Sequence, residues 1–304
     1  MKKVLPIAMP NCIKTFHMTA IPIAILKGLE VEISDKVLAD YIDIVNWKDT
    51  INYHYHKKLR ESYFERKLFY SNDNDLVKNI KKNIDRMRYV VLTVNEYFIP
   101  LRIANKFAFD YEHDLLIYGY DDNQEKFYIF SYADINYYTR TLCTQKIKYK
   151  DIVTAYKFSK KLNNMFHNYS LEFNNNCFQN DLVSNQRYFD LKLKEYAARQ
   201  IKRDRMKLYI HLEKVTTTKR ANKIFIQNIH LLYEQKVILE ILASQYYKQK
   251  ILYFENIKRE TYKLLLMFIK AMIKDDEQLK NKAVDYLLEI EKKEWKFLSD
   301  FLNK

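Results

Sequence analysis

The spacing of apolar residues divides the chain into a mixed N-terminal part and a helical remainder. From Asp151 onward, apolar residues recur at helical spacing. The chain contains no sequence repeat of 20–50 residues. The apolar spacing predicts helices over residues 152–168, 188–209, 224–256, 258–273 and 275–302. We therefore expect an α+β domain at residues 1–150, followed by a mainly α-helical domain at residues 151–304.

The strand signals lie in the N-terminal part. Residues 89–98 (YVVLTVNEYF) are rich in β-forming residues and end shortly before Pro100, which predicts a strand. Residues 111–134 predict a hairpin, because two apolar runs flank a polar turn cluster. Gly119 permits a kink or bulge in the first run. His113 would then lie at the mouth of this hairpin.

Three helices are expected before these strands. They cover residues 13–27, where Pro22 would kink or divide the helix, residues 40–47, and residues 63–87 with a polar loop at 71–75. Cys12 directly precedes the first helix. Since a helix N-terminus favours a thiolate, Cys12 is a candidate reactive thiol.

Composition supports two differently built parts and an acidic partner. All four prolines and both glycines lie within the first 119 residues. The net charge is +14, and the lysines interleave with apolar residues, which is typical of solvated helix faces. Such a surface attracts acidic molecules. Basic charge with interleaved aromatics also occurs in nucleic-acid-binding proteins, but no helix-turn-helix, zinc module or RNA-recognition motif is visible, so no nucleic acid is expected.

The three cysteines exclude a disulfide framework. Cys12, Cys143 and Cys177 are too few for one, and their spacing does not suit a metal. A reducing cytoplasm is therefore expected. The apolar run after Lys2-Lys3 is cut short by Pro10 and Asn11, so it is not a signal peptide. No segment is long enough to cross a bilayer, and we expect neither a membrane nor a metal partner.

Cys12 and His113 form the sharpest candidate for chemistry, because a thiol nucleophile needs a base. Spacing alone leaves the plainer alternative open, in which Cys12 is a small buried hydrophobe and His113 a turn residue. His17 is the rival base. His54 and His56 could share a strand face, but no third metal ligand accompanies them. His230 begins a core-like helix and is expected to be structural.

Four stretches resemble the butirosin biosynthesis protein H type of proteins. They are Asn11-Cys12, residues 91–100 (VLTVNEYFIP), residues 113–122 (HDLLIYGYDD) and residues 229–236 (IHLLYEQK). The resemblance implies a papain-like domain, similar to the bacteriocin-processing peptidases, followed by a helical domain.

The resemblance also implies an activity. The family's pattern makes Cys12 the nucleophile and His113 the base of an acyltransferase that forms amides in specialised, antibiotic-type biosynthesis. Its donor would be a phosphopantetheine thioester on an acidic acyl or peptidyl carrier protein, its acceptor a small-molecule amine, and no further cofactor is implied. The helical half would shape the acceptor pocket and could provide a homodimer contact.

The sequence departs from the family pattern at three places. The third catalytic residue is usually Asp, but Ser131 stands there; Asp134 could substitute, or a backbone carbonyl could orient the imidazole. Asn95 replaces a commoner Asp, and we assign it, with Tyr97, to the substrate side. No glutamine precedes Cys12, so Asn11 or the Cys12 N–H would supply the oxyanion hole. A cysteine peptidase or amidase and an inactive scaffold of the same fold remain alternatives.

Overall fold

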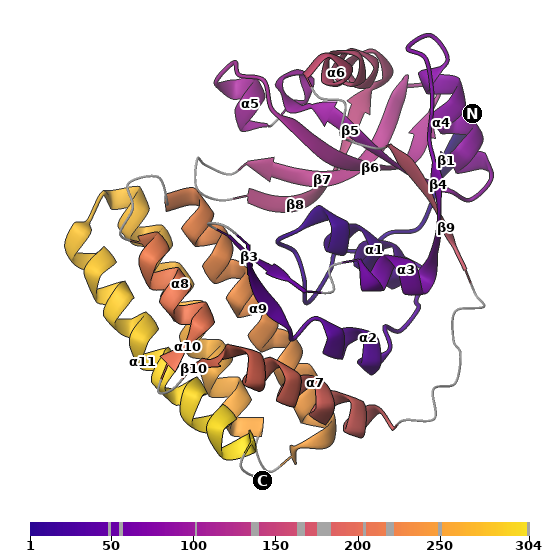
Figure 1. Cartoon of the computed structure of the whole chain (residues 1–304). Helices are drawn as coiled ribbons and strands as arrows, with labels where there is room; N and C mark the ends of the chain where they lie inside the picture. The colour runs from indigo at the N-terminus through magenta and orange to yellow at the C-terminus, as the bar shows by residue number, and fades with distance from the viewer. Residues whose placement is uncertain are drawn as a thin grey trace. The chain divides into compact units, whose positions relative to one another are not determined.

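The computed structural model divides the chain into two compact units (Figure 1). It describes residues 1–47, 50–54, 57–100, 102–134, 140–162, 168–174, 184–202, 205–216, 222–248 and 251–302. Unit 1 comprises Met1–Glu32 and Leu59–Gln179, and unit 2 comprises Ile33–Lys58 and Asn180–Lys304. The expected boundary at residue 150 therefore differs from the compact units in two respects: unit 1 continues past it, and unit 2 takes an N-terminal segment.

Unit 1 is built on a seven-stranded antiparallel sheet. The order is β4-β9-β5-β6-β7-β8, and β1 pairs with β6 off this path. The strands are β1 (Lys2–Val4), β4 (Phe64–Leu68), β5 (Tyr89–Asn95), β6 (Glu112–Asp121), β7 (Lys126–Asp134), β8 (Arg140–Lys148) and β9 (Tyr169–Phe173). All seven residues of β5 are buried, as expected for a strand that is covered on both faces.

Helices provide that cover. Those of unit 1 are α1 (His17–Gly28), α3 (Lys58–Tyr63), α4 (Leu76–Asp85), α5 (Ile103–Lys106) and α6 (Tyr149–Leu162), with the 3₁₀ turn η1 (Glu96–Phe98). Figure 1 shows α1 and α6 on opposite sides of the sheet, and they pack against β6 and β5, respectively. Nine of the twelve α1 residues are buried, so this helix is a core element rather than an amphipathic surface helix.

Both glycines lie where backbones approach closely. A Cβ on Gly28 would lie 2.3 Å from the Ile7 Cα, and a Cβ on Gly119 would lie 2.7 Å from the Lys3 oxygen. The register of β6 against β7 shifts between Ile117 and Gly119, which confirms the predicted bulge. The absence of a side chain at Gly119 lets β1 pair tightly with β6.

Unit 2 is mainly helical. Its helices are α2 (Asp35–Asp40), α7 (Asn185–Gln200), α8 (Lys207–Thr216), α9 (Asn222–Tyr246), α10 (Ile251–Lys274) and α11 (Glu277–Leu302). Two small hairpins accompany them, β2 (Ile44–Trp47) with β3 (Thr50–Tyr53) and β10 (Ile201–Lys202) with β11 (Arg205–Met206). An ion pair between Lys236 and Glu294 lies in its core, 2.5 Å long, with the Lys236 side chain fully buried.

The sequence predicted long local elements well and strand partners poorly. The strand at residues 89–98, the hairpin and the helices α9 to α11 are confirmed, although β5 ends at Asn95. The helix predicted at 40–47 is wrong, because β2 occupies part of it. The prediction for 63–87 is wrong before its polar loop, where β4 lies, and confirmed after the loop, where α4 lies. β9 lies within the supposedly helical half and pairs with β4 about a hundred residues earlier. Pairing over that distance leaves no local signal.

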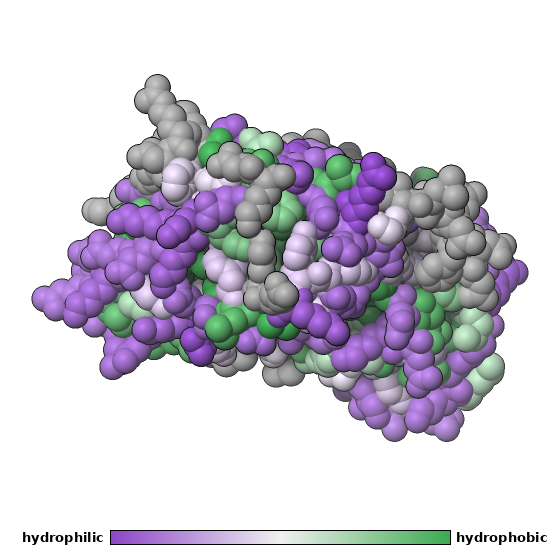
Figure 2. Space-filling model, turned by 90° about the horizontal axis from the view of Figure 1, so that it is seen from below, coloured by the Kyte–Doolittle hydropathy of each residue, from purple (hydrophilic) through white to green (hydrophobic). Residues whose placement is uncertain are grey.

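No helix of the described part of the chain is long and apolar enough to cross a membrane. Hydrophilic side chains cover most of the face seen in Figure 2, with smaller apolar areas between them. This surface agrees with the high content of charged residues.

Candidate functional site

His113 lies near the start of β6, directly opposite Val94 of β5. Its Nδ1 is 3.2 Å from the Asp114 backbone oxygen. Because a carbonyl oxygen can only accept, Nδ1 carries the proton in this hydrogen bond. The lone pair of the neutral ring is then on Nε2, which is the nitrogen that could take a proton from a substrate or nucleophile.

Three aromatic rings surround His113. His17, the first residue of α1, lies edge-on with its ring centroid 4.3 Å from that of His113. Tyr132 of β7 stacks on His17 at 4.3 Å and lies 5.9 Å from His113. Tyr111 stacks on His113 at 5.8 Å. Residues of α1, of β7 and of the segment before β6 therefore converge on this imidazole.

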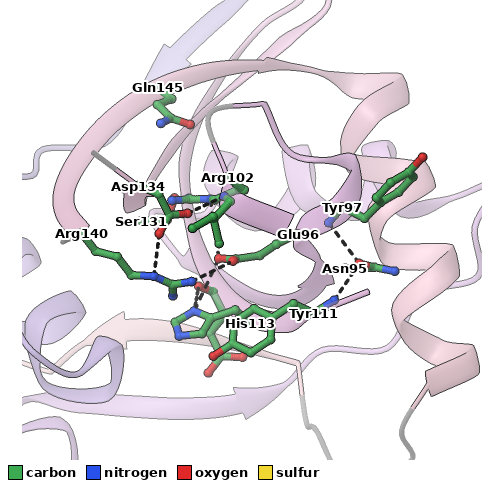
Figure 3. A network of polar contacts seen from close by, with 12 residues as sticks. Asn95, Glu96, Tyr97, Arg102, Tyr111, His113, Ser131, Asp134, Arg140 and Gln145 are labelled. Carbon is green, nitrogen blue, oxygen red and sulfur yellow. Dashed lines mark hydrogen bonds and ion pairs between the residues drawn. The ribbon is translucent and has the colours of Figure 1, made fainter. Parts of the chain in front are cut away.

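A buried carboxylate, Glu96, connects His113 to two arginines (Figure 3). Glu96 is only 2% exposed. Its Oε1 lies 3.6 Å from the Arg102 Nε and 4.0 Å from the His113 Nδ1, and its Oε2 lies 3.7 Å from the Arg140 Nη2. The distance to His113 is too long for a hydrogen bond, and the contact becomes an ion pair only when His113 is protonated. Glu96 is therefore the carboxylate that approaches the candidate base.

The surroundings keep both histidines neutral. Burial, with a further contribution from Arg140, lowers the pKa of His113 to about 4. Burial and the neighbouring His113 lower the pKa of His17 well below its usual value. Both effects disfavour a positive charge on the rings. At neutral pH His113 is therefore the neutral imidazole, protonated at Nδ1 only, and its Nε2 can accept a second proton.

Ser131 and Asp134 have arginine partners. The Ser131 hydroxyl, which is fully buried, accepts a hydrogen bond from Arg102 Nη2. Asp134 accepts one from the Ile103 N–H at 2.6 Å and pairs with the Arg140 Nε at 2.8 Å. The sequence predicted that Ser131, Asp134 or a backbone carbonyl orients His113. The carbonyl of Asp114 holds the ring, and Ser131 and Asp134 hold the arginines around Glu96.

Cys12 is buried but does not precede a helix directly. The helix α1 begins at His17, with Phe16 as its N-cap, so the prediction that Cys12 lies at a helix N-terminus is wrong. The intervening segment is attached to β7, because the Tyr132 hydroxyl donates to the Lys14 oxygen. Two residues of chain span at most about 7 Å, so Cys12 is confined to the neighbourhood of that attachment. Its pairing with His113 remains a prediction.

The residues assigned to the substrate side have structural contacts. Asn11 is exposed. The Asn95 Oδ1 accepts hydrogen bonds from the backbone N–H groups of Tyr97 at 3.0 Å and Tyr111 at 3.3 Å, and its Nδ2 donates to Asp110 at 2.7 Å. Asn95 therefore organises the backbone beside the site. Tyr97 is 36% exposed, and its predicted role remains untested.

Sequence reasoning missed Arg102, Arg140, Tyr111 and the role of Glu96. A signal existed for Glu96, which is the acidic residue of the stretch at 91–100 that carries the family resemblance. The two arginines gave no signal in the sequence, because what marks them is their burial beside carboxylates. Tertiary packing alone distinguishes them.

The remaining candidate residues that the structure describes give no second centre. No group of three or more His, Cys, Asp or Glu residues suited to a metal occurs within the described ranges. The Cys143 Sγ accepts a contact from the Gln145 Nε2 at 3.1 Å, and the His230 Nδ1 lies 3.3 Å from Glu234. Cys177 lies outside the described residues, as does His56 of the predicted histidine pair.

Comparison with known proteins shows only weak similarity. No protein-family model matches the chain, and no curated protein does. A solved structure from Bacillus anthracis, described as a C39-like peptidase, is 16% identical. The alignment covers 57% of this chain and 98% of that one, with a TM-score of 0.33. A likeness of that size is too small to assign a fold or an activity.

Proposed function

We propose that unit 1 is a papain-like, cysteine-dependent acyltransferase domain in which Cys12 is the nucleophile and His113 the base. The observation that carries the proposal is the orientation of His113. Its Nδ1 proton is directed to the Asp114 carbonyl, and Glu96 lies 4.0 Å away. A neutral imidazole held in one tautomer beside a carboxylate is the arrangement that general-base catalysis requires.

The proposed reaction has two acyl-transfer steps. The Cys12 Sγ attacks the thioester carbonyl while the His113 Nε2 takes the thiol proton and passes it to the departing thiolate of the donor. An amine then attacks the acyl-enzyme. His113 takes the amine proton and returns it to Cys12 as the amide leaves. Glu96 would stabilise the imidazolium that forms between these transfers.

The proposed donor is a thioester on an acidic carrier protein, and the acceptor is an amine. A thioester suits this site because it needs less activation than an amide. The net charge of +14 would accelerate encounter with an acidic protein, and the effect would weaken with added salt.

A second candidate function is a binding or scaffold protein without activity. Two observations favour it. The residue at the N-terminus of α1 is His17 rather than a cysteine, and Cys12 is only 6% exposed. A buried thiol away from a helix N-terminus lacks one of the usual sources of reactivity.

Intact-protein mass spectrometry distinguishes these functions. The wild type, Cys12→Ala and Cys143→Ala are each mixed with an acyl-loaded carrier protein and then with a panel of amines. Cys143→Ala is the matched control, because it removes a half-buried thiol of the same unit. The proposal predicts an acyl adduct on the wild type and Cys143→Ala, none on Cys12→Ala, and its discharge as an amide.

The other outcomes have defined meanings. Discharge to water without dependence on the amine would favour a hydrolase. If no adduct forms, and iodoacetamide labels Cys12 no faster than Cys143, both enzymatic functions fail. The scaffold function would then be tested by whether Cys12→Ala leaves the biological role of the protein intact.

A further inference from the structure

The His113 side chain is 24% exposed, and one exposed aromatic ring lies beside it. Of the three rings around it, His17 is 5% exposed and Tyr132 is 8% exposed, whereas Tyr111 is 41% exposed. Phe109, also 40% exposed, lies edge-on to Tyr111 with a centroid distance of 6.5 Å. A row of rings therefore leads from the surface of unit 1 to the candidate base.

The backbone beneath this row is fixed on both sides. The Tyr111 N–H donates to the Asn95 Oδ1, and the Tyr111 oxygen accepts from the Glu96 N–H at 2.7 Å. Asn95 and Glu96 thus anchor Tyr111 at the strand that carries the buried network. With its backbone anchored, Tyr111 can uncover more of the His113 ring only by rotation of its side chain.

The exposed rings have a chemical preference. Large exposed apolar side chains in a cluster commonly mark a binding surface. Aromatic rings bind other flat rings by offset stacking or edge-to-face contact. Arg140 lies over the Tyr111 ring, 5.4 Å from its centroid, and this contact limits which face of the ring a ligand can use.

We propose that Tyr111, which partly covers the His113 ring, and Phe109 together bind an aryl group of the substrate. This inference rests on the proposed function for its reactive partner, Cys12, and identifies the acyl group as aromatic. The aryl group packs against the two rings. This contact brings the carbonyl carbon of the aromatic acyl group close to His113. Small aliphatic acyl groups lack the surface to use this contact.

The first test measures access to His113 without requiring catalysis. Diethylpyrocarbonate modifies neutral imidazoles, and peptide mass spectrometry gives the rate at His113 relative to His230. Tyr111→Ala and Tyr111→Leu should raise the His113 rate several-fold, whereas Tyr111→Phe, which keeps the ring, should not. Tyr70→Ala is the control for loss of an exposed aromatic of unit 1, since Tyr70 is 76% exposed. Benzamide should slow the modification in the wild type and in Tyr70→Ala, but not in Tyr111→Ala.

The second test measures selectivity. The benzoyl and acetyl thioesters of N-acetylcysteamine are compared as donors to Cys12. Tyr111→Ala should lower the benzoyl-to-acetyl ratio of acylation rates about tenfold, the loss expected for one aromatic contact. Phe109→Ala should lower it less, and Tyr111→Phe should retain it.

The two proposals fail differently. If neither thioester acylates Cys12 but benzamide protection of His113 is lost in Tyr111→Ala, the transferase function fails and the aryl site stands. If the Tyr111 variants change neither the modification rate nor the protection by benzamide, the aryl site is overturned, whatever Cys12 does.

Discussion

His17 and His113 lie in edge-to-face contact, with their ring centroids 4.3 Å apart and their planes at 71°. Neither ring nitrogen of His17 has a hydrogen-bond partner among the residues that the structure describes, and His17 is 5% exposed. A buried polar group without a partner costs free energy. His17 therefore contributes a buried imidazole without hydrogen bonds in the described part of the chain, and His113 contributes the imidazole that is oriented for proton transfer.

Replacing His17 by phenylalanine should separate the roles of the two rings. The variant keeps the stack on Tyr132 while removing two unsatisfied nitrogens, so the free energy of unfolding should rise by about 1 kcal/mol. If His113 is the base, acyl transfer should persist. Loss of transfer in a folded His17→Phe protein would instead make His17 the base. Urea denaturation and the adduct assay provide the two measurements, and His17→Ala, which leaves a cavity, should destabilise.

Stability should fall in mild acid because of the same histidines. In the unfolded chain the pKa of a histidine is about 6.5, whereas the pKa of His113 in the folded chain is about 4. Between these values the unfolded state binds more protons, so the stabilisation present above about pH 6.5 is lost as pH falls toward 4. For His113 the loss should be about 3 kcal/mol or less.

Urea denaturation between pH 7.5 and 4.5 measures this dependence. His113→Gln cannot titrate and should show a flatter curve than the wild type. An unchanged slope in that variant would show that His113 is not held neutral by the fold.

Neutralising Glu96 should destabilise unit 1 strongly. Glu96→Gln leaves the buried Arg102, whose side chain is 1% exposed, without its nearest carboxylate. Breaking a buried ion pair from one side costs about 3 kcal/mol or more. Glu65→Gln is the matched control, because Glu65 pairs with Lys67 at 3.1 Å at the surface and should cost less than about 1 kcal/mol. Equal thermal shifts for the two variants would contradict a charge-holding role for Glu96.

The buried pair of unit 2 should behave in the same way. Lys236→Met leaves Glu294 charged in the core, where Tyr209 donates to it at 2.5 Å, and should cost about 3–5 kcal/mol. Adding Glu294→Gln should recover part of that loss, because no charge then remains buried. The exposed pair Lys293–Glu260, 2.7 Å long, is the control, and Lys293→Met should cost less than about 1 kcal/mol. A double mutant no more stable than Lys236→Met would argue against coupling.

Gly28 should tolerate no side chain. The Cβ of Gly28→Ala would lie within 2.7 Å of three Ile7 backbone atoms, so the N-terminal segment would have to move from α1. Overpacking of this kind costs about 1–3 kcal/mol. Lys27→Ala, one residue earlier on the exposed side of the helix, should change the melting temperature little. A Gly28→Ala protein as stable as wild type would show that this segment is not packed as described.

The sequence by itself determined the elements whose signals are local. The β-branched run in β5, the turn between β6 and β7, the bulge at Gly119 and the long amphipathic helices of unit 2 follow from residue type and spacing. It also identified His113 as a candidate base. These features depend on neighbours within a few turns or one hairpin, so they can be read without the fold.

Only the tertiary structure decided the pairings over long sequence distances. It joined β4 to β9, assigned Ser131 and Asp134 to arginines, and brought Glu96 and His17 beside His113. In the folded chain α1 begins at His17 and not directly after Cys12. Burial and charge proximity are properties of the packed chain, and the spacing of these residues in the sequence does not encode which of them meet.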